Sequence, residues 1–203
     1  IVAPWGGPFG RLGTNPFCAG FPVAGGEPVI VDLATSRWAG GKVRVAMDNG
    51  ETLPDGILLD EAGEPTNDPG KLWSEPRGAL LPMGEHKGYA LALAIELLAG
   101  ALVGGATQNG GPRDAILNSM FSILIRPDAI GAPGAYDERT GALLDWVRSA
   151  APGVRIPGEP ERASRARLVA EGVPLDGANW TRIAAEARRA GVADGDITAC
   201  LVT

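Results

Sequence analysis

The chain has 203 residues, of which 45% are hydrophobic and 21% charged, and its formal net charge at pH 7 is −6. This composition is that of a globular protein long enough for one good core or two small ones. A negative net charge without a block of Lys and Arg argues against a nucleic-acid-binding protein. One His and two distant Cys residues are too few for a zinc site, so no metal is expected.

The first quarter of the chain predicts a β-hairpin followed by a helix. Residues 16–23 and 28–32 are short apolar runs separated by Ala-Gly-Gly-Glu, which is the pattern of two strands joined by a tight turn. Residues 34–47 alternate small, basic and apolar side chains and predict a helix. Residues 49–77 contain turn signals and several prolines, so we expect an extended excursion over the surface.

The middle of the chain is the most apolar part. Residues 88–103 predict the strongest helix, and their apolar side chains occur on all sides, which indicates burial. This run is too short to span a bilayer and contains Glu96, so a cytoplasmic protein without a membrane partner is expected. Residues 109–118 resemble a loop, and residues 119–125 alternate little, which predicts a strand buried on both faces.

The last third of the chain is expected to be helical. Residues 136–149 predict one helix, and a second runs from Pro160, which suits a first helical position, to about residue 171. A third helix is expected at 180–190, with Asn179 as its cap and a glycine after it.

Polar residues stand where the first strand of the predicted hairpin begins and where its second strand ends. Thr14 and Asn15 offer a hydroxyl and an amide where the first strand begins, although this Gly-Thr-Asn-Pro motif alone is more typical of a plain turn. The second strand ends in Asp32, followed by Thr35 and Ser36, and ligands often bind at strand ends. Asp32 there suits orientation of a catalytic His or binding of a ribose hydroxyl. The alternative is that Asp32 caps a helix with the two hydroxyl residues in its first turn.

A glycine-rich segment, residues 82–88, directly precedes the predicted buried helix. Its glycines allow a ligand to approach the backbone, the helix start offers free N–H groups and Lys87 adds positive charge, which together suit a phosphate or carboxylate. The spacing of a Walker A loop is absent. His86 in this segment is as typical of a structural as of a functional residue. A fourth segment, residues 155–160, predicts a rigid turn into a helix.

In this order the four segments resemble the malate/L-lactate dehydrogenase-like oxidoreductases, a family without a Rossmann fold. The resemblance rests on GTNP, VDLATS followed by GKV, GALLPMGEHKGYALALAIELLAGAL, RIPGEPE and GVPLDGANW, and it covers residues 8–192. No GxGxxG motif follows a strand, which argues against a Rossmann dehydrogenase.

The resemblance implies an α/β fold in which a mostly antiparallel sheet with surrounding helices binds NADH or NADPH. We therefore expect a cofactor-binding domain at residues 1–135 and a C-terminal helical segment at residues 136–203. It also implies a homodimer that transfers a hydride between the cofactor and a 2-keto or 2-hydroxy acid. Both nicotinamide cofactors remain compatible with the sequence.

Individual residues acquire expected roles from the same resemblance. Asp32 would stand near the catalytic His and orient it, and Thr14 would lie close to the substrate. The residues expected to touch the cofactor are Asp32, Leu33, Ala34, Thr35, Ser36, His86, Lys87, Gly158 and Glu159. Glu85 departs from the family pattern, in which a glycine is expected.

The proton-donating His of the family lies in an N-terminal segment that these residues do not include. The chain also starts without Met, so we expect it to be the C-terminal portion of a longer enzyme, inactive alone, with residues 136–203 packing on the absent part. The alternative is a catalytically inactive dimerisation or ligand-binding module of the same fold.

Overall fold

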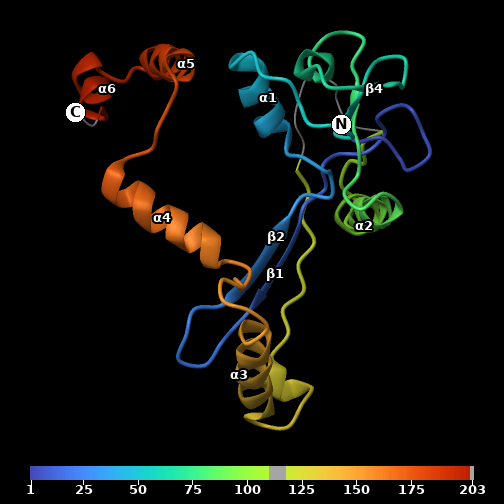
Figure 1. The fold of residues 1–203 in the computed structure, drawn as a ribbon, viewed down its shortest axis with the longest axis vertical. Coiled ribbons are helices and arrows are strands. Elements are labelled where there is room, and N and C mark those ends of the chain that lie inside the picture. The colour runs from blue at the N-terminus through green and yellow to red at the C-terminus, as the bar shows by residue number, and fades with distance from the viewer. Residues whose placement is uncertain (110–117, 202–203) are drawn as a thin grey trace.

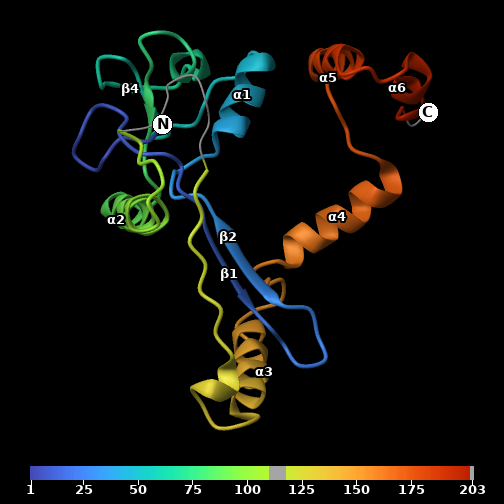
Figure 2. The ribbon, with the colours of Figure 1, turned by 180° about the vertical axis from the view of Figure 1, so that it is seen from behind.

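The computed structural model describes residues 1–109 and 118–201 of the chain. These residues form a mixed α/β fold, as expected, in which the strands are divided between two small antiparallel sheets. Its helices are α1 (Gly40–Asp48), α2 (His86–Ile95), α3 (Ala135–Arg148), α4 (Glu159–Glu171), α5 (Gly177–Arg189) and α6 (Asp194–Ala199), with a π-helix η2 (Glu96–Leu102) and 3-10 helices η1 (Pro69–Leu72) and η3 (Pro127–Ala129). Figures 1 and 2 show the hairpin running from the part that holds α1, α2 and β4 towards α3.

The predicted hairpin is confirmed as β1 (Phe17–Phe21) and β2 (Val29–Leu33), which pair antiparallel. The predicted turn is present, since Gly26 N donates to Val23 O at 3.1 Å, but it lies within a longer loop, residues 22–28, because the strand pairing ends at Phe21 and Val29. Pro22 and Pro28 flank this loop, and a proline has no N–H with which to extend the ladder. The hydroxyl of Tyr136 in α3 donates to Pro22 O at 3.1 Å and ties the loop to that helix.

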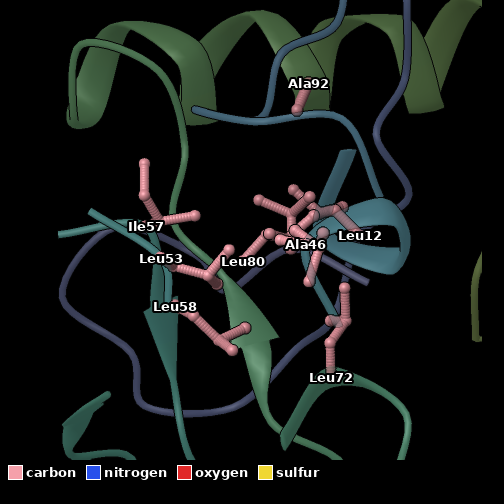
Figure 3. Packing of buried hydrophobic residues seen from close by; sticks show 10 residues of the cluster. Leu12, Ala46, Leu53, Ile57, Leu58, Leu72, Leu80 and Ala92 are labelled. Carbon is pink, nitrogen blue, oxygen red and sulfur yellow. The ribbon is translucent and has the colours of Figure 1, made fainter. Parts of the chain in front are cut away.

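The core contains residues from the segment that was expected to be a surface excursion. Residues 49–77 hold β3 (Leu58–Leu59) and β4 (Pro65–Thr66), and β3 lies between β4 and β5 (Ala79–Leu80). The prolines exclude long elements but not two-residue strands or a 3-10 turn, so the apolar residues between them still reach the interior. The buried cluster in Figure 3 consists of Val2, Leu12, Val43, Ala46, Leu53, Ile57, Leu58, Leu72, Leu80 and Ala92.

Two further predictions about burial are wrong for the described chain. In α2 only Gly88 and Ala92 are buried, and Leu102 near the end of η2 is 66% exposed. Only one side of α2 therefore packs on the core. Residues 119–125 form no strand, and Leu124 is 93% exposed, because no described segment exchanges backbone hydrogen bonds with them.

The C-terminal helices follow the predicted order. α3 and α4 are confirmed, with Pro160 in the first turn of α4. α5 begins earlier than expected because Asp176, and not Asn179, is its cap: the Asp176 carboxylate accepts from Asn179 N at 2.8 Å. α5 contacts α1 through an ion pair of 2.7 Å between Arg182 and Asp48. In the described part of the chain, no helix is long and apolar enough to cross a membrane.

Candidate functional site

Thr35 connects the loop that contains Thr14 with the glycine-rich segment, residues 82–88. Its side chain is fully buried. Its backbone N–H and its Oγ1 both donate to Thr14 O at 2.9 Å, and its carbonyl accepts from Met83 N at 2.9 Å. Thr35 therefore holds the loop before β1 against the glycine-rich loop before α2.

The alternative interpretation of Asp32, Thr35 and Ser36 as a helix cap and first turn is wrong. The cap position of α1 is Ala39, and Ser36 Oγ donates to Trp38 O at 2.7 Å. The predicted helix at 34–47 starts only at residue 40, because the preceding backbone is bonded to neighbouring loops.

Asp32 is exposed on β2, and the partly buried Leu33 and Ala34 follow it at the strand end. Alternate strand residues share a face, so Asp32 and Ile30 lie on the same side of the hairpin. Cys18 is the register partner of Asp32 on β1. Directly opposed Cβ atoms are about 4.5–5.5 Å apart, which places the Cys18 thiol beside this carboxylate.

The glycine-rich loop makes a sharp turn into α2. Gly84 and Glu85 have φ angles of 52° and 57°, and Lys87 N donates to Gly84 O at 3.1 Å. Glycine adopts such angles more readily than glutamate does, which explains why a glycine was expected at position 85. A Cβ on Gly88 would lie 2.3 Å from Met83 O, so only glycine fits there.

His86 and Lys87 are both exposed at the start of α2. The imidazole of His86 meets the Trp5 ring edge to face, with 5.6 Å between the ring centroids. The Lys87 ammonium forms no ion pair with a described residue. A free cation at a helix N-terminus is a suitable environment for an anion. Nothing in the sequence pattern around Trp5 indicates its contact with His86.

Gly158 and Glu159 lie at the other end of the hairpin. Gly158 is buried against β2 with a φ of 96°, and Ile30 N donates to Pro157 O at 3.1 Å. Glu159 accepts from Arg148 Nη2 at 2.8 Å and from Ile156 N at 2.8 Å. The Arg148 guanidinium first, and then the Ile156 N–H, lower the pKa of Glu159.

A hollow of about 360 Å³ lies beside Glu159. Its walls come from the hairpin loop, α3 and the start of α4, and its charged lining residues are Glu27, Arg148, Glu159 and Arg162. Arg162 also donates to Pro28 O at 3.0 Å. The two arginines were not singled out from the sequence, because their pairing with Glu159 and the hairpin depends on how the helices pack.

The residues expected at the cofactor and the substrate thus lie along β2 and beyond its two ends. Thr14, Thr35 and the His86 loop lie at one end, and Gly158 lies at Ile30, five positions before Thr35. An extended chain spans no more than about 3.3–3.6 Å per residue, and β2 ends at Leu33, so the two ends are at most about 18 Å apart. Asp32 lies between them. Such a line suits an extended ligand better than a compact one. Among the described residues, no group of three or more His, Cys, Asp or Glu side chains is placed to hold a metal.

Comparisons with known proteins agree on one family. The family described as malate/L-lactate dehydrogenase matches residues 1–184. The chain is 41% identical to hydroxycarboxylate dehydrogenase B of Escherichia coli (strain K12), over 98% of this chain and 57% of that protein. It is 38% identical to L-sulfolactate dehydrogenase of Methanothermobacter thermautotrophicus, over 92% of this chain and 55% of that protein.

The solved structures show the same relation. The crystal structure of delta1-piperideine-2-carboxylate reductase from Pseudomonas syringae pv. tomato superposes with a TM-score of 0.75 at 36% identity. This match covers 89% of the present chain and 55% of the reductase. Sulfolactate dehydrogenase from Methanocaldococcus jannaschii gives a TM-score of 0.69 at 28% identity, over 97% of this chain and 58% of the other. The chain therefore spans little more than half the length of these relatives.

Proposed function

The chain belongs to the malate/L-lactate dehydrogenase family, and we propose that the protein containing it transfers a hydride between NAD(P)H and a 2-keto or 2-hydroxy acid. The names of the relatives, which include hydroxycarboxylate and L-sulfolactate dehydrogenases, support an oxidoreductase acting on a small acid. The observation that carries the proposal is the Thr35 hydrogen-bond set. It brings Thr14 beside the glycine-rich loop, at one end of the line of expected cofactor residues.

The residues on this line fit the chemistry of a dinucleotide. Lys87 and the start of α2 offer positive charge to a pyrophosphate. The exposed carboxylate of Asp32 suits a ribose hydroxyl, and Gly158 and Glu159 are proposed to touch the cofactor at the other end of the hairpin. The cofactor supplies the hydride when it is bound, and Thr14 is proposed to lie near the substrate. The proposal covers either cofactor, NADH or NADPH.

Reduction of a carbonyl leaves an alkoxide that needs a proton, and a positioned general acid contributes about 10²–10⁴-fold. The only imidazole of the chain is that of His86, which belongs to the proposed cofactor loop and packs against the Trp5 ring. We therefore propose that the donor comes from outside residues 1–203 and that Asp32 orients it. Residues 1–135 then form the cofactor-binding domain, and residues 136–203 pack against the part that carries the donor.

A first experiment measures the cofactor affinity of the Lys87→Ala variant by titration of NAD(P)H fluorescence. Removing one charged hydrogen bond should weaken binding by about 1–3 kcal/mol. Arg189→Ala, which removes an 82% exposed positive side chain on α5, is the matched control and should leave the affinity unchanged. Equal affinities for wild type and Lys87→Ala would remove Lys87 from the cofactor site.

The two cysteines provide a second experiment without any substitution. Both are free and exposed, but only Cys18 lies beside Asp32. NAD(P)H should slow the alkylation of Cys18 and leave Cys200 unaffected, as measured by mass spectrometry. Equal rates for Cys18 with and without cofactor would contradict the placement along β2.

The inactivity of residues 1–203 alone is tested with NAD(P)H and a panel of 2-keto acids. We expect no turnover, because the proposed proton donor is outside the chain. Rates near those of ordinary enzymes, about 1–10³ s⁻¹, would show that His86 or Lys87 performs this chemistry.

The proposal includes a homodimer. The apolar side chains of α2 and η2 that the described chain leaves exposed, such as Leu97 at 55%, support association, because large exposed apolar patches mark interfaces. Light scattering coupled to size exclusion should give twice the mass of one chain. A monomer at micromolar concentration would contradict it.

A further inference from the structure

Three segments of the chain meet at the carboxylate of Glu96. Asn15 Nδ2 donates to Glu96 Oε2 at 2.8 Å and also to Ala92 O at 2.9 Å. The backbone N–H of Gln108 donates to Glu96 Oε1. The loop before β1, the end of α2 and the chain after η2 are thereby joined at one half-buried side chain.

Asn15 depends on this anchor for its conformation. Its φ is 29°, in the left-handed region that few residues other than glycine adopt without cost. A Cβ on Gly13, two residues earlier, would lie 2.5 Å from Asn15 Oδ1, so the Asn15 side chain occupies the space that the missing side chain of Gly13 leaves. The hydrogen bonds to Glu96 and Ala92 offset the backbone strain and fix the direction in which the loop leaves Thr14.

The helix changes its geometry at the same residue. The Glu96 N–H is shared between Ala92 O and Leu93 O, and the π-helix η2 begins there. The Asn15 amide is a further donor to Ala92 O. Short π-helical segments inside helices occur frequently at functional sites.

A series of hydrogen bonds connects Glu96 and Asn15 to the proposed cofactor residues. Thr14 precedes Asn15 and accepts both hydrogen bonds of Thr35, whose carbonyl accepts from Met83 N. Met83 O in turn accepts from Gly88 N at 2.9 Å in the first turn of α2, and α2 leads back to Glu96. These hydrogen bonds form a continuous path from Asn15 to the loop that carries His86 and Lys87.

We propose that Glu96 is a positioning residue, which holds Asn15 and thereby sets the positions of Thr14 and the glycine-rich loop relative to each other. Glu96 acts through these residues and does not touch cofactor or substrate. The kinetic part of the proposal rests on the function proposed above. The structural part, the coupling of Glu96 to the glycine-rich loop, does not.

The structural part is tested by hydrogen exchange on the full protein. Glu96→Gln keeps the shape but leaves one acceptor oxygen for the two donors, Asn15 and Gln108. We expect faster exchange in peptides covering residues 82–88 and unchanged exchange at β3 and β5. Glu186→Gln, an exposed glutamate on α5, is the control and should change neither. Unchanged exchange at 82–88 in Glu96→Gln would overturn the coupling.

The kinetic part is tested with a reciprocal swap. Glu96→Gln should lower kcat by about tenfold or more, because small misplacements of positioned groups are costly, and should weaken NAD(P)H binding by a smaller factor, because Lys87 itself is kept. Asn15→Asp sets two carboxylates against each other and should lower kcat further. Combining the two changes restores a donor–acceptor pair and should recover part of the loss.

The outcomes separate the two proposals. A swap no more active than Asn15→Asp alone, or an unchanged kcat with a lower Tm in Glu96→Gln, would overturn the positioning role. If the wild-type protein neither binds NAD(P)H nor reduces a keto acid, the proposed function fails instead. The exchange measurement then still decides whether Glu96 holds the glycine-rich loop.

Discussion

Gly158 is the residue at which the turn before α4 touches β2, and the variant Gly158→Ala measures the cost of that contact. A left-handed conformation such as its φ of 96° costs a residue with a Cβ about 1–2 kcal/mol. The new Cβ would lie 3.3 Å from both N and Cβ of Ile30, and 2.7 Å from Arg162 Nη1. The arginine end can move, but Ile30 N donates to Pro157 O at 3.1 Å. Weakening that hydrogen bond adds about 0.5–1.5 kcal/mol, so we expect the free energy of unfolding to fall by about 1.5–3.5 kcal/mol.

Gly134 provides the matched control, because it precedes α3 just as Gly158 precedes α4. Its φ and ψ are 74° and −16°, against 96° and −23° for Gly158, but no atom lies within 4 Å of a Cβ built on it. Urea unfolding followed by circular dichroism should therefore show the backbone cost alone, about 1–2 kcal/mol, for Gly134→Ala. Equal losses in the two variants would refute the reasoning that the Ile30 contact is tight.

Three further predictions concern the core, the ion pair at the hollow and the proposed orienting carboxylate. Val43→Ala should lower the free energy of unfolding by about 1.5–3 kcal/mol, and Val45→Ala on the exposed side of α1 by no more than about 0.5 kcal/mol; equal urea midpoints would contradict the observed core. Arg148 lowers the pKa of Glu159, so the wild-type protein should be more stable than Glu159→Gln above the ordinary glutamate pKa of 4.5. This difference in stability should disappear as the pH falls through the lower pKa of the folded state, and a difference that grows on acidification would contradict the pairing. Asp32→Asn should lower kcat of the active protein more than it raises KM, and a variant with full kcat would remove Asp32 from the chemistry.

The sequence by itself determines the elements whose signals are local. Two apolar runs around a glycine pair predict the hairpin, and Pro160 marks the start of α4 within one residue. The candidate site residues are also recognisable, because Thr14, Asp32 and Lys87 stand at element boundaries where polar groups are free to meet a ligand. Local spacing and motif order therefore identify the family and the segments to inspect.

Only the tertiary structure decides which of these segments meet and which apolar residues are covered. Thr35 looks like a first-turn helix residue in the sequence, yet its hydrogen bonds go to Thr14 and Met83, which are distant along the chain. Leu58 is fully buried in a proline-rich segment that predicts surface, while Leu124 is 93% exposed in a run that predicts a buried strand. The physical reason is the same in each case. Helix and turn signals depend on neighbours within a few residues. Strand pairing, the burial of a side chain and the hydrogen bond from Asn15 to Glu96 depend instead on residues that only folding brings together.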